Sequence, residues 1–350
     1  MVRSVTSFED NFHLTYPHNN GFTDNGRGLI LGRNSEKESS LWKIEEGGNH
    51  RELCRFERES QPEKMLWFDV AGEVPVAVTI ADKKLWRLDL GAPGESREIY
   101  AAPEGKWLHA IPAIRADGKL ALCGLHGPRC FEALLVDVDS GSARVLFEKP
   151  WMTNHFHFCP FDPEWIGFSH EGNCAKVMDR VWAWHAEKAA QGSCFFEQMP
   201  TDPERTLFAG HERWCFHDRS VMVVAYGEGP GRPRGIYEAF TDGRPQRFVS
   251  EGDRDMHLDV SRDGQWIAID TSGPLDASGK GWENSHGISD IVVAARATGE
   301  RRVVARSTIS KHPSHPHPVF SPDARLIYYN EGSADGLRNR VCCVENPFLT

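Results

Sequence analysis

The stretch 257-HLDVSRDGQWIAIDT-271 contains two short apolar runs that flank an Asp-Gly pair. Asp-Gly supplies the positive φ that a tight hairpin turn requires, so the stretch predicts two antiparallel strands joined at Asp263-Gly264. Units of this kind recur along the chain, and seven of them in 350 residues average about 50 residues each. Their turns are placed at Asn25-Gly26, Ala71-Gly72, Asp117-Gly118, Asp162-Pro163, His217-Asp218, Asp263-Gly264 and Pro322-Asp323.

Short apolar or alternating runs fill the chain between turn residues, and helical periodicity is scarce. The nearest candidate for a helix, 176-KVMDRVWAWHAEKAAQ-191, could equally be a strand followed by a helical turn. Repeated units of three or four short strands are typical of a β-propeller. We therefore predict an all-β fold, a seven-bladed β-propeller in which residues 1–350 form a single domain.

The composition excludes several classes of protein. The chain has 40 Lys and Arg against 50 Asp and Glu, and the two signs are interspersed, so we expect no positive surface for nucleic acid. No run approaches the ~18 apolar residues of a membrane helix, and the N-terminal segment has no apolar core of signal-peptide length. Nine cysteines without C-x-x-C spacing indicate reduced thiols. We predict a cytoplasmic protein with no nucleic-acid or membrane partner.

Histidines recur at a fixed place relative to the turns. In a propeller, the first strand of each blade lines the central channel and runs from one face to the hairpin turn. Histidines six to eight residues before a turn should therefore gather at one mouth of the channel. The alternative is that a single histidine only ties blade to blade through hydrogen bonds, and His211 after Gly210 has that form. The histidines at this spacing are His109, His155, His211, His257, His315 and His317.

The segment 311-KHPSHPHPVFSPD-323 interleaves three histidines with prolines. Proline is tolerated at the first residues of a strand, and side chains two apart face the same way in extended backbone. His315 and His317 can therefore face a common point. Several imidazoles at one mouth predict a metal ion and an acid/base group, and spacing alone does not choose among Zn, Mn, Fe and Ni. The predicted ligands are His257, His312, His315 and His317.

Four segments together carry a resemblance to a known family. They are 154-NHFHFCPFDPEWIGFSHEG-172 with 179-DRVW-182, 210-GHERW-214, 257-HLDVSRDG-264 and 312-HPSHPHPVFSPD-323. With these motifs in this order, the sequence resembles the oligogalacturonate lyases, seven-bladed propellers of a polysaccharide lyase family. The likeness covers most of the chain.

The resemblance implies β-elimination on short uronic-acid oligomers, as in pectin degradation. It implies a manganese ion held at His257, His312, His315 and His317, with His211 as the base and Arg180 as a substrate-binding residue. His312 stands where the family has glutamine, and imidazole suits Zn, Fe or Ni as well as Mn. The divalent metal is therefore left open. The segment 172-GNCAKVMD-179 and the overall length also depart from the family, which leaves the particular uronate open.

The β-elimination that the resemblance implies explains why histidines and an arginine would be needed in the site. Elimination removes the C5 proton next to the uronate carboxylate, so a metal ion and the guanidinium of Arg180 can offset the charge that develops. A neutral His211 can accept the proton. The proton for the O4 leaving group is left open between water and His211. His155 and Trp214 are further candidates for binding the sugar, against a structural role, and Glu171 in the His-Glu-Gly motif is interpreted as structural.

Two other functions stay open at this point. One is a non-catalytic, TolB-like propeller that binds a partner, which would carry no metal. The other keeps the metal site but acts as an isomerase or as a lyase on a different uronate. The sequence does not predict the oligomeric state.

Overall fold

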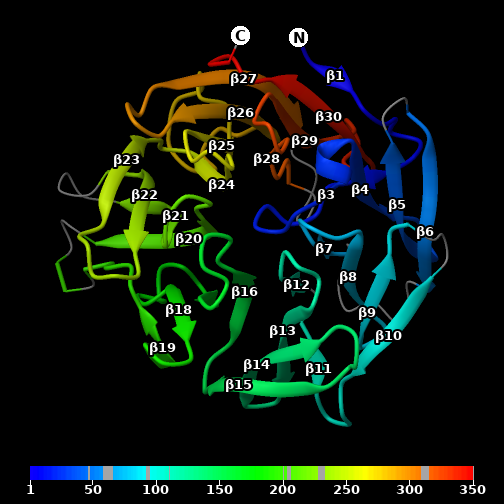
Figure 1. Ribbon diagram of the computed structural model, residues 1–350. Coiled ribbons are helices and arrows are strands. Elements are labelled where there is room, and N and C mark those ends of the chain that lie inside the picture. The colour runs from blue at the N-terminus through cyan, green and yellow to red at the C-terminus, as the bar shows by residue number, and fades with distance from the viewer. Residues whose placement is uncertain are drawn as a thin grey trace.

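Seven antiparallel sheets stand around a central axis in the computed structural model, so the protein is a seven-bladed β-propeller (Figure 1). This confirms the fold predicted from the repeats. The described part of the chain contains strands, one short 3-10 turn, η1 (Asp24–Gly26), and no α-helix. The structure describes residues 1–45, 48–57, 66–91, 95–109, 111–199, 201–202, 206–227, 233–308 and 315–349.

Each blade is an antiparallel meander whose first strand lies nearest the axis. The first three blades comprise β2 (Phe12–His13), β3 (Phe22–Thr23), β4 (Gly28–Asn34), β5 (Glu38–Glu45) and β6 (His50–Glu57); β7 (Phe68–Val70), β8 (Val76–Ala81), β9 (Lys84–Asp89) and β10 (Ser96–Ala101); and β11 (Trp107–Leu108), β12 (Ala113–Ile114), β13 (Leu120–Gly127), β14 (Cys130–Asp137) and β15 (Ala143–Lys149).

The remaining four blades follow in chain order. They comprise β16 (Thr153–Phe158), β17 (Ile166–His170), β18 (Val181–His185) and β19 (Ala189–Cys194); β20 (Leu207–Trp214), β21 (Ser220–Gly227), β22 (Gly235–Phe240) and β23 (Arg247–Glu251); β24 (Asp255–Val260), β25 (Trp266–Thr271), β26 (Ile288–Ala295) and β27 (Arg301–Thr308); and β28 (Val319–Phe320), β29 (Leu326–Gly332), β30 (Asn339–Glu345) and β1 (Arg3–Ser4). The segment 176–191 therefore contributes β18 and the start of β19 and forms no helix. No helix in the described ranges has the length and hydropathy that crossing a membrane requires.

The ring is closed within its last blade. β1 pairs antiparallel with β30, with Arg3 opposite Cys343 and Ser4 opposite Cys342. The last blade thus takes its outer strand from the N-terminal end and its other three strands from the C-terminal end. Figure 1 shows both ends of the chain beside this blade.

Hydrophobic clusters among the described residues fill the seven interfaces between neighbouring blades. Between the fifth and sixth blades, Met222 and Val224 pack with Leu258 and Ile267. A blade is covered on both faces, so its side chains are apolar in both directions along the strand. Each fully buried Leu or Ile contributes about 1.5–3 kcal/mol. Stability therefore rests on the contacts between blades, which leaves the axis available to polar residues.

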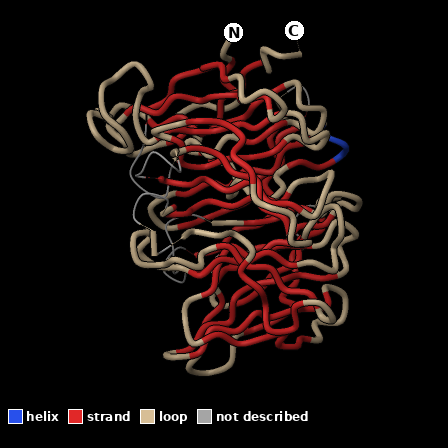
Figure 2. The backbone as a smooth tube through the Cα atoms, turned by 90° about the vertical axis from the view of Figure 1, so that its left-hand side faces the viewer, coloured by secondary structure: helices blue, strands red, loops and turns tan. Residues whose placement is uncertain are grey.

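The turns fix the direction of the inner strands. After β24, the backbone N–H of Gly264 donates to the carbonyl of Ser261 at 2.9 Å, and the Ser261 hydroxyl donates to Asp263 at 2.6 Å. Gly264 has a φ of +69°, and a Cβ there would meet the His217 ring at 2.1 Å, so only glycine fits. The turn predicted at Asp263-Gly264 is present. The side view in Figure 2 shows loops at the two faces of the ring and strands running between them.

Candidate functional site

The histidines predicted to share one mouth stand at irregular points of the inner strands, in the N-terminal half of β16 and β24 and in the middle of β20. The register of β16, β20 and β24 shifts at His155, His211 and His257, respectively. A bulge leaves a residue outside the ladder and changes the direction of its side chain. His155, His211 and His317 also have φ of 53°, 51° and 47°. Left-handed backbone at a residue other than glycine costs on the order of 1–3 kcal/mol, so the surrounding structure must enforce it.

Four of the predicted site residues meet near the axis. The ring centre of His257 lies 4.1 Å from that of His211, 4.3 Å from that of His317 and 5.2 Å from that of His315. The rings of His315 and His317 are 5.9 Å apart. His312, the remaining predicted metal ligand, lies outside the described residues. His109 belongs to a different pair, because its ring lies 5.2 Å from that of His126.

A buried carboxylate orients two of these histidines. Asp270 on β25 accepts hydrogen bonds from the backbone N–H of His257 at 2.7 Å and from that of His317 at 2.9 Å. Both oxygens of Asp270 also lie 3.1 Å from Nδ1 of His257. Burial raises the pKa of Asp270 to about 6, so the group is mostly ionised at neutral pH and accepts a hydrogen bond from Nδ1–H of His257. The acceptor lone pair of His257 is then on Nε2.

Tyr16 lies at the centre of the cluster. Its ring centre is 4.9 Å from that of His155, 5.3 Å from that of His317 and 6.1 Å from that of His257. Its hydroxyl is 3.2 Å from Nδ1 of His211. Sequence analysis missed Tyr16 because it stands between β2 and β3, outside the repeating pattern of strand and turn. The available signal was the polar and aromatic composition of 13-HLTYPHNN-20 between two short apolar runs.

Arg180 is held by a buried network of charges. Its guanidinium forks onto Glu171, at 2.9 Å and 3.3 Å, and Nδ1 of His155 lies 3.0 Å from Glu212. Burial alone would raise the pKa of both carboxyls, but His155 and Arg180 lower that of Glu171 and hold that of Glu212 at about 2. Both groups are therefore ionised. Sequence analysis missed Glu212, and it did not foresee that Glu171 would hold Arg180.

His211 is neutral in this setting. Burial lowers the pKa of its imidazole well below the usual 6.5, and the neighbouring His257 and Arg180 lower it further. A neutral imidazole beside a cluster of other imidazoles can accept a proton at physiological pH.

Trp214 does not face the site, so the prediction that it stacks on a sugar is wrong. Its side chain is 0% exposed and lies in the hydrophobic cluster between the fourth and fifth blades, 6.1 Å from Phe195 in a stacked arrangement. Side chains alternate along a strand. Because Arg213 lines the channel, the next residue points between the blades.

Two groups of three metal-type side chains in the described ranges have ligand atoms within 4.8 Å of one another, and neither group includes the axial histidines. In the first, made of Cys215, His217 and Glu238, the carboxylate is already paired with Arg296 at 2.8 Å and with Arg247. In the second, made of Cys130, Glu132 and Glu148, Glu132 is paired with Lys106. These cations already neutralise the two buried glutamates. The axial histidines are therefore the better candidate for a metal.

Fold and site together define a class: a seven-bladed propeller whose inner strands bring histidines, an arginine and buried carboxylates to one end of its axis.

No family model matches the chain. A curated protein, the oligogalacturonate lyase of Dickeya dadantii (strain 3937), is 24% identical over 208 residues, which cover 57% of this chain and 52% of that protein. The chain thus spans about half the length of this relative.

Solved structures agree in fold. An oligogalacturonate lyase in complex with manganese superposes with a TM-score of 0.79 at 18% identity, over 99% of this chain and 93% of that one. An oligogalacturonate lyase from Vibrio parahaemolyticus gives a TM-score of 0.79 at 17% identity, over the same shares. The resemblance to oligogalacturonate lyases that the four motifs carry is thereby confirmed.

Proposed function

We propose that the protein is a metal-dependent carbon–oxygen lyase that cleaves short oligouronides by β-elimination. The observation that carries this proposal is the contact between the rings of His211 and His257, 4.1 Å apart at their centres. This contact places His211, the proposed neutral base, directly beside the histidines that are proposed to bind a metal. The similarity to oligogalacturonate lyases supports galacturonate oligomers as the first substrate to test.

The axial histidines fit a divalent transition metal. Two imidazoles bound to one ion at 2.0–2.1 Å place their ring centres roughly 4.5–5.5 Å apart. The spacings among His257, His315 and His317 are 4.3, 5.2 and 5.9 Å, so small side-chain movements would suffice. These three residues would hold the ion, together with His312 as predicted from the sequence. A similar solved lyase contains manganese, which favours that metal over Zn, Fe or Ni. When bound, the ion would supply Lewis acidity to the uronate carboxylate.

His211 would take the C5 proton. If its Nδ1 donates to the Tyr16 hydroxyl at 3.2 Å, the lone pair is on Nε2, which becomes the base. Burial keeps that nitrogen unprotonated before the substrate arrives. The protonated imidazole can return its proton to the O4 leaving group, with water as the other source.

Arg180 would orient the substrate carboxylate. Its fork is already bonded to Glu171, and its Nε is buried with no hydrogen-bond partner among the described residues. A substrate carboxylate that reaches Arg180 would therefore add to an existing ion pair, whose rigidity keeps the guanidinium in place. His155, fixed by Glu212, would contact the sugar from the same side.

The test is turnover on defined oligouronides. Purified protein is incubated with di- and trigalacturonate and with glucuronate oligomers, and ultraviolet absorbance reports the unsaturated uronate. Bound metal is measured by elemental analysis. The chelated protein should lose activity and regain it with one or more of Mn²⁺, Zn²⁺, Fe²⁺ and Ni²⁺. Absence of unsaturated product on every oligouronide with metal-loaded protein would contradict the proposal.

Asp270→Asn tests the metal site separately. The amide keeps an oxygen for only one of the two backbone N–H groups, which bond to different oxygens of Asp270, and it loses the charge behind His257. Loss of such a partner lowers metal affinity about 10–100-fold. Equilibrium dialysis against Mn²⁺ measures the change. Asp276→Asn, a change at a carboxylate whose side chain is 71% exposed, serves as the matched control. Equal affinity in the two variants would place the metal elsewhere.

A further inference from the structure

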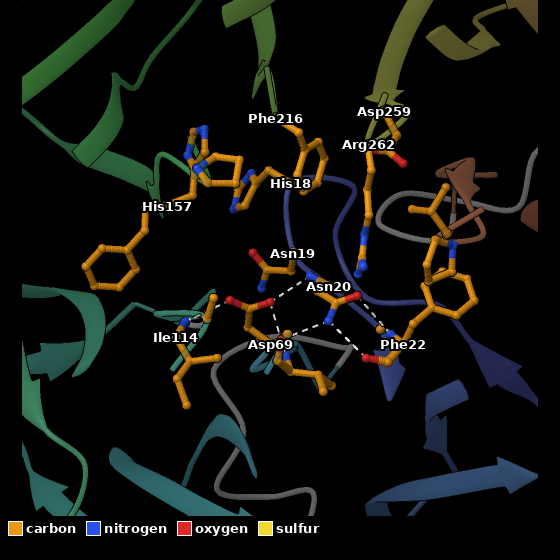
Figure 3. Close-up of a pocket in the computed structure, with 18 of the residues that line it drawn as sticks. His18, Asn19, Asn20, Phe22, Asp69, Ile114, His157, Phe216, Asp259 and Arg262 are labelled. Atoms are coloured by element: carbon orange, nitrogen blue, oxygen red, sulfur yellow. Dashed lines mark hydrogen bonds between the residues drawn. The ribbon is translucent and has the colours of Figure 1, made fainter. Parts of the chain in front are cut away.

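The axial channel contains a chamber on the C-terminal side of the histidine cluster along the inner strands, which we call the second chamber. A cavity of about 440 Å³ is lined by the C-terminal ends of the inner strands, and His155, His211 and His257 stand two residues before the lining residues of their own strands. Figure 3 shows this chamber, with His18, His157 and Phe216 on one side and Asp69 and Ile114 on the other. Its inner lining comes from all seven blades and includes Asp69, Ile114, His157, Arg213, Asp259 and Phe320.

The segment between β2 and β3 lies between the histidine cluster and the second chamber. Tyr16 contacts the histidine cluster, and His18 and Asn19 line the second chamber. The segment is firmly anchored, because the Asn19 amide donates to the carbonyls of Phe68 at 2.9 Å and Pro112 at 2.8 Å. The second chamber therefore has polar groups of its own on a fixed wall.

The floor of the second chamber presents polar atoms that have no hydrogen-bond partner among the described residues. They are both ring nitrogens of His18, Nε2 of His157 and Oδ1 of Asn19, on side chains that are 4% exposed or less. Nδ1 of His157 donates to the carbonyl of His155 at 2.6 Å, so its Nε2 is an acceptor in the neutral ring. Oδ1 of Asn19 is also an acceptor. Leaving such atoms buried and unpaired is costly, and a ligand with several hydroxyl groups would satisfy them.

The rim supplies a positive charge. Arg262 extends across the chamber toward Asn20 (Figure 3), and it has no ion pair among the described residues. The two other arginines of the chamber are paired, Arg213 with Asp259 at 2.9 Å and Arg115 with its neighbour Asp117 at 2.7 Å. One guanidinium is therefore available for an anion, and a guanidinium matches a carboxylate in charge and geometry.

We infer that this chamber binds one small polyhydroxylated carboxylate, a sugar acid, with its carboxylate on Arg262 and its hydroxyl groups on His18, His157 and Asn19. A volume of about 440 Å³ falls within the roughly 300–1,000 Å³ of small-molecule sites and suits a single ring. The inference rests on this chamber alone. It does not depend on the lyase activity proposed for the histidine cluster.

The test is calorimetric titration of the full chain carrying His211→Ala and His257→Ala, so that binding at the histidine cluster is weakened. D-galacturonate and D-glucuronate should bind, and methyl β-D-galactoside, which lacks the carboxylate, should bind at least tenfold more weakly. Arg262→Gln should weaken binding of the acids at least tenfold. Arg325→Gln removes the same charge from an arginine whose side chain is 79% exposed and lies outside the chamber, and it should leave affinity unchanged.

His18→Phe tests the floor, and circular dichroism checks that the variant is folded. The His18 ring stacks on His157 at 4.9 Å and makes no hydrogen bond with the described residues, so phenylalanine keeps the packing and removes only the nitrogens. Both the acids and the neutral glycoside should bind this variant several-fold more weakly. The inference is overturned if the acids do not bind at millimolar concentration, if acid and glycoside bind alike, or if Arg262→Gln and Arg325→Gln behave alike.

Discussion

The two ends of the inner strands differ in the regularity of their backbone. The ladders are bulged in the N-terminal half of β16 and β24 and in the middle of β20, and His155 and His211 have left-handed backbone. At the C-terminal end of β24, three consecutive residue pairs stay in register, and a glycine turn follows. The difference shows that two parts of one strand can have different roles. Its regular end fixes blade geometry, and its irregular end presents functional side chains.

The largest expected effect is at the bulge of β20. His211→Ala removes the proposed base, and a positioned base is worth about 10²–10⁴-fold in rate. We expect kcat/KM on trigalacturonate to fall by that factor while circular dichroism and metal content stay unchanged. His286→Asn, at an exposed histidine with a φ of 50°, is the control and should keep full turnover. Wild-type activity in His211→Ala would remove His211 from the mechanism.

The second prediction concerns stability against pH. The pKa of Glu212 is about 2 in the folded protein against 4.5 ordinarily, so its ionised form stabilises the fold above pH 4.5. That contribution, roughly 3 kcal/mol at most, is lost as pH falls from 4.5 toward 2. The difference in free energy of unfolding between wild type and Glu212→Gln should therefore shrink on acidification. Urea unfolding at several pH values measures it.

Glu187→Gln, at an exposed glutamate, is the control for this measurement and should follow the wild-type curve. If Glu212→Gln has the same dependence on pH as the wild type, the charge network around Arg180 does not stabilise the fold.

The third prediction tests the regular end. Gly264→Ala combines a φ of +69° with a Cβ that would meet the His217 ring, whereas Gly243→Ala has a φ of +84° and no atom within 4 Å. Left-handed backbone alone costs about 1–2 kcal/mol. Thermal unfolding should show a larger loss of stability for Gly264→Ala than for Gly243→Ala. Both variants should retain the wild-type kcat. If the two variants are equally stable, the contact with His217 does not contribute to the free energy of unfolding.

The smallest effect is expected at Tyr16. Tyr16→Phe keeps the ring contacts with the histidines and removes only the hydroxyl that lies 3.2 Å from His211. A net hydrogen bond is worth about 0.5–1.5 kcal/mol, so kcat/KM should fall about tenfold or less. Tyr100→Phe, on an outer strand of another blade, is the matched control. A loss as large as that of His211→Ala would make Tyr16 a direct participant in proton transfer.

The repeat period and the Asp-Gly turns were enough to predict the fold, because both are local properties of the sequence. The meeting of His211, His257, His315 and His317 followed from their distance to those turns. Asp270 was not predicted, although the hairpin predicted over 257–271 places β25 beside β24, because the register of this pairing shifts between Asp255 and Leu258. A bulge of this kind has no signal in the repeat, and it decides which residue lies opposite Asp270.

Two errors have a common cause. The bulge at His211 shifts the alternation of side chains by one residue, so proximity in sequence does not tell which residues after it face the channel. Trp214 was predicted to bind the sugar because it is close to His211 in the sequence. Glu212, which is adjacent to His211, was not predicted to belong to the site. Tyr16 was missed because an insertion between strands has no place in a repeat.

The left-handed backbone at His155, His211 and His317 also has an evolutionary consequence. Glycine adopts this conformation without penalty, so a glycine there would relieve torsional cost while destroying the reactive group. A laboratory selection for heat resistance alone, without demand for turnover, should accumulate glycine at these three codons. Histidine would persist there only in lineages that are also selected for what the propeller does.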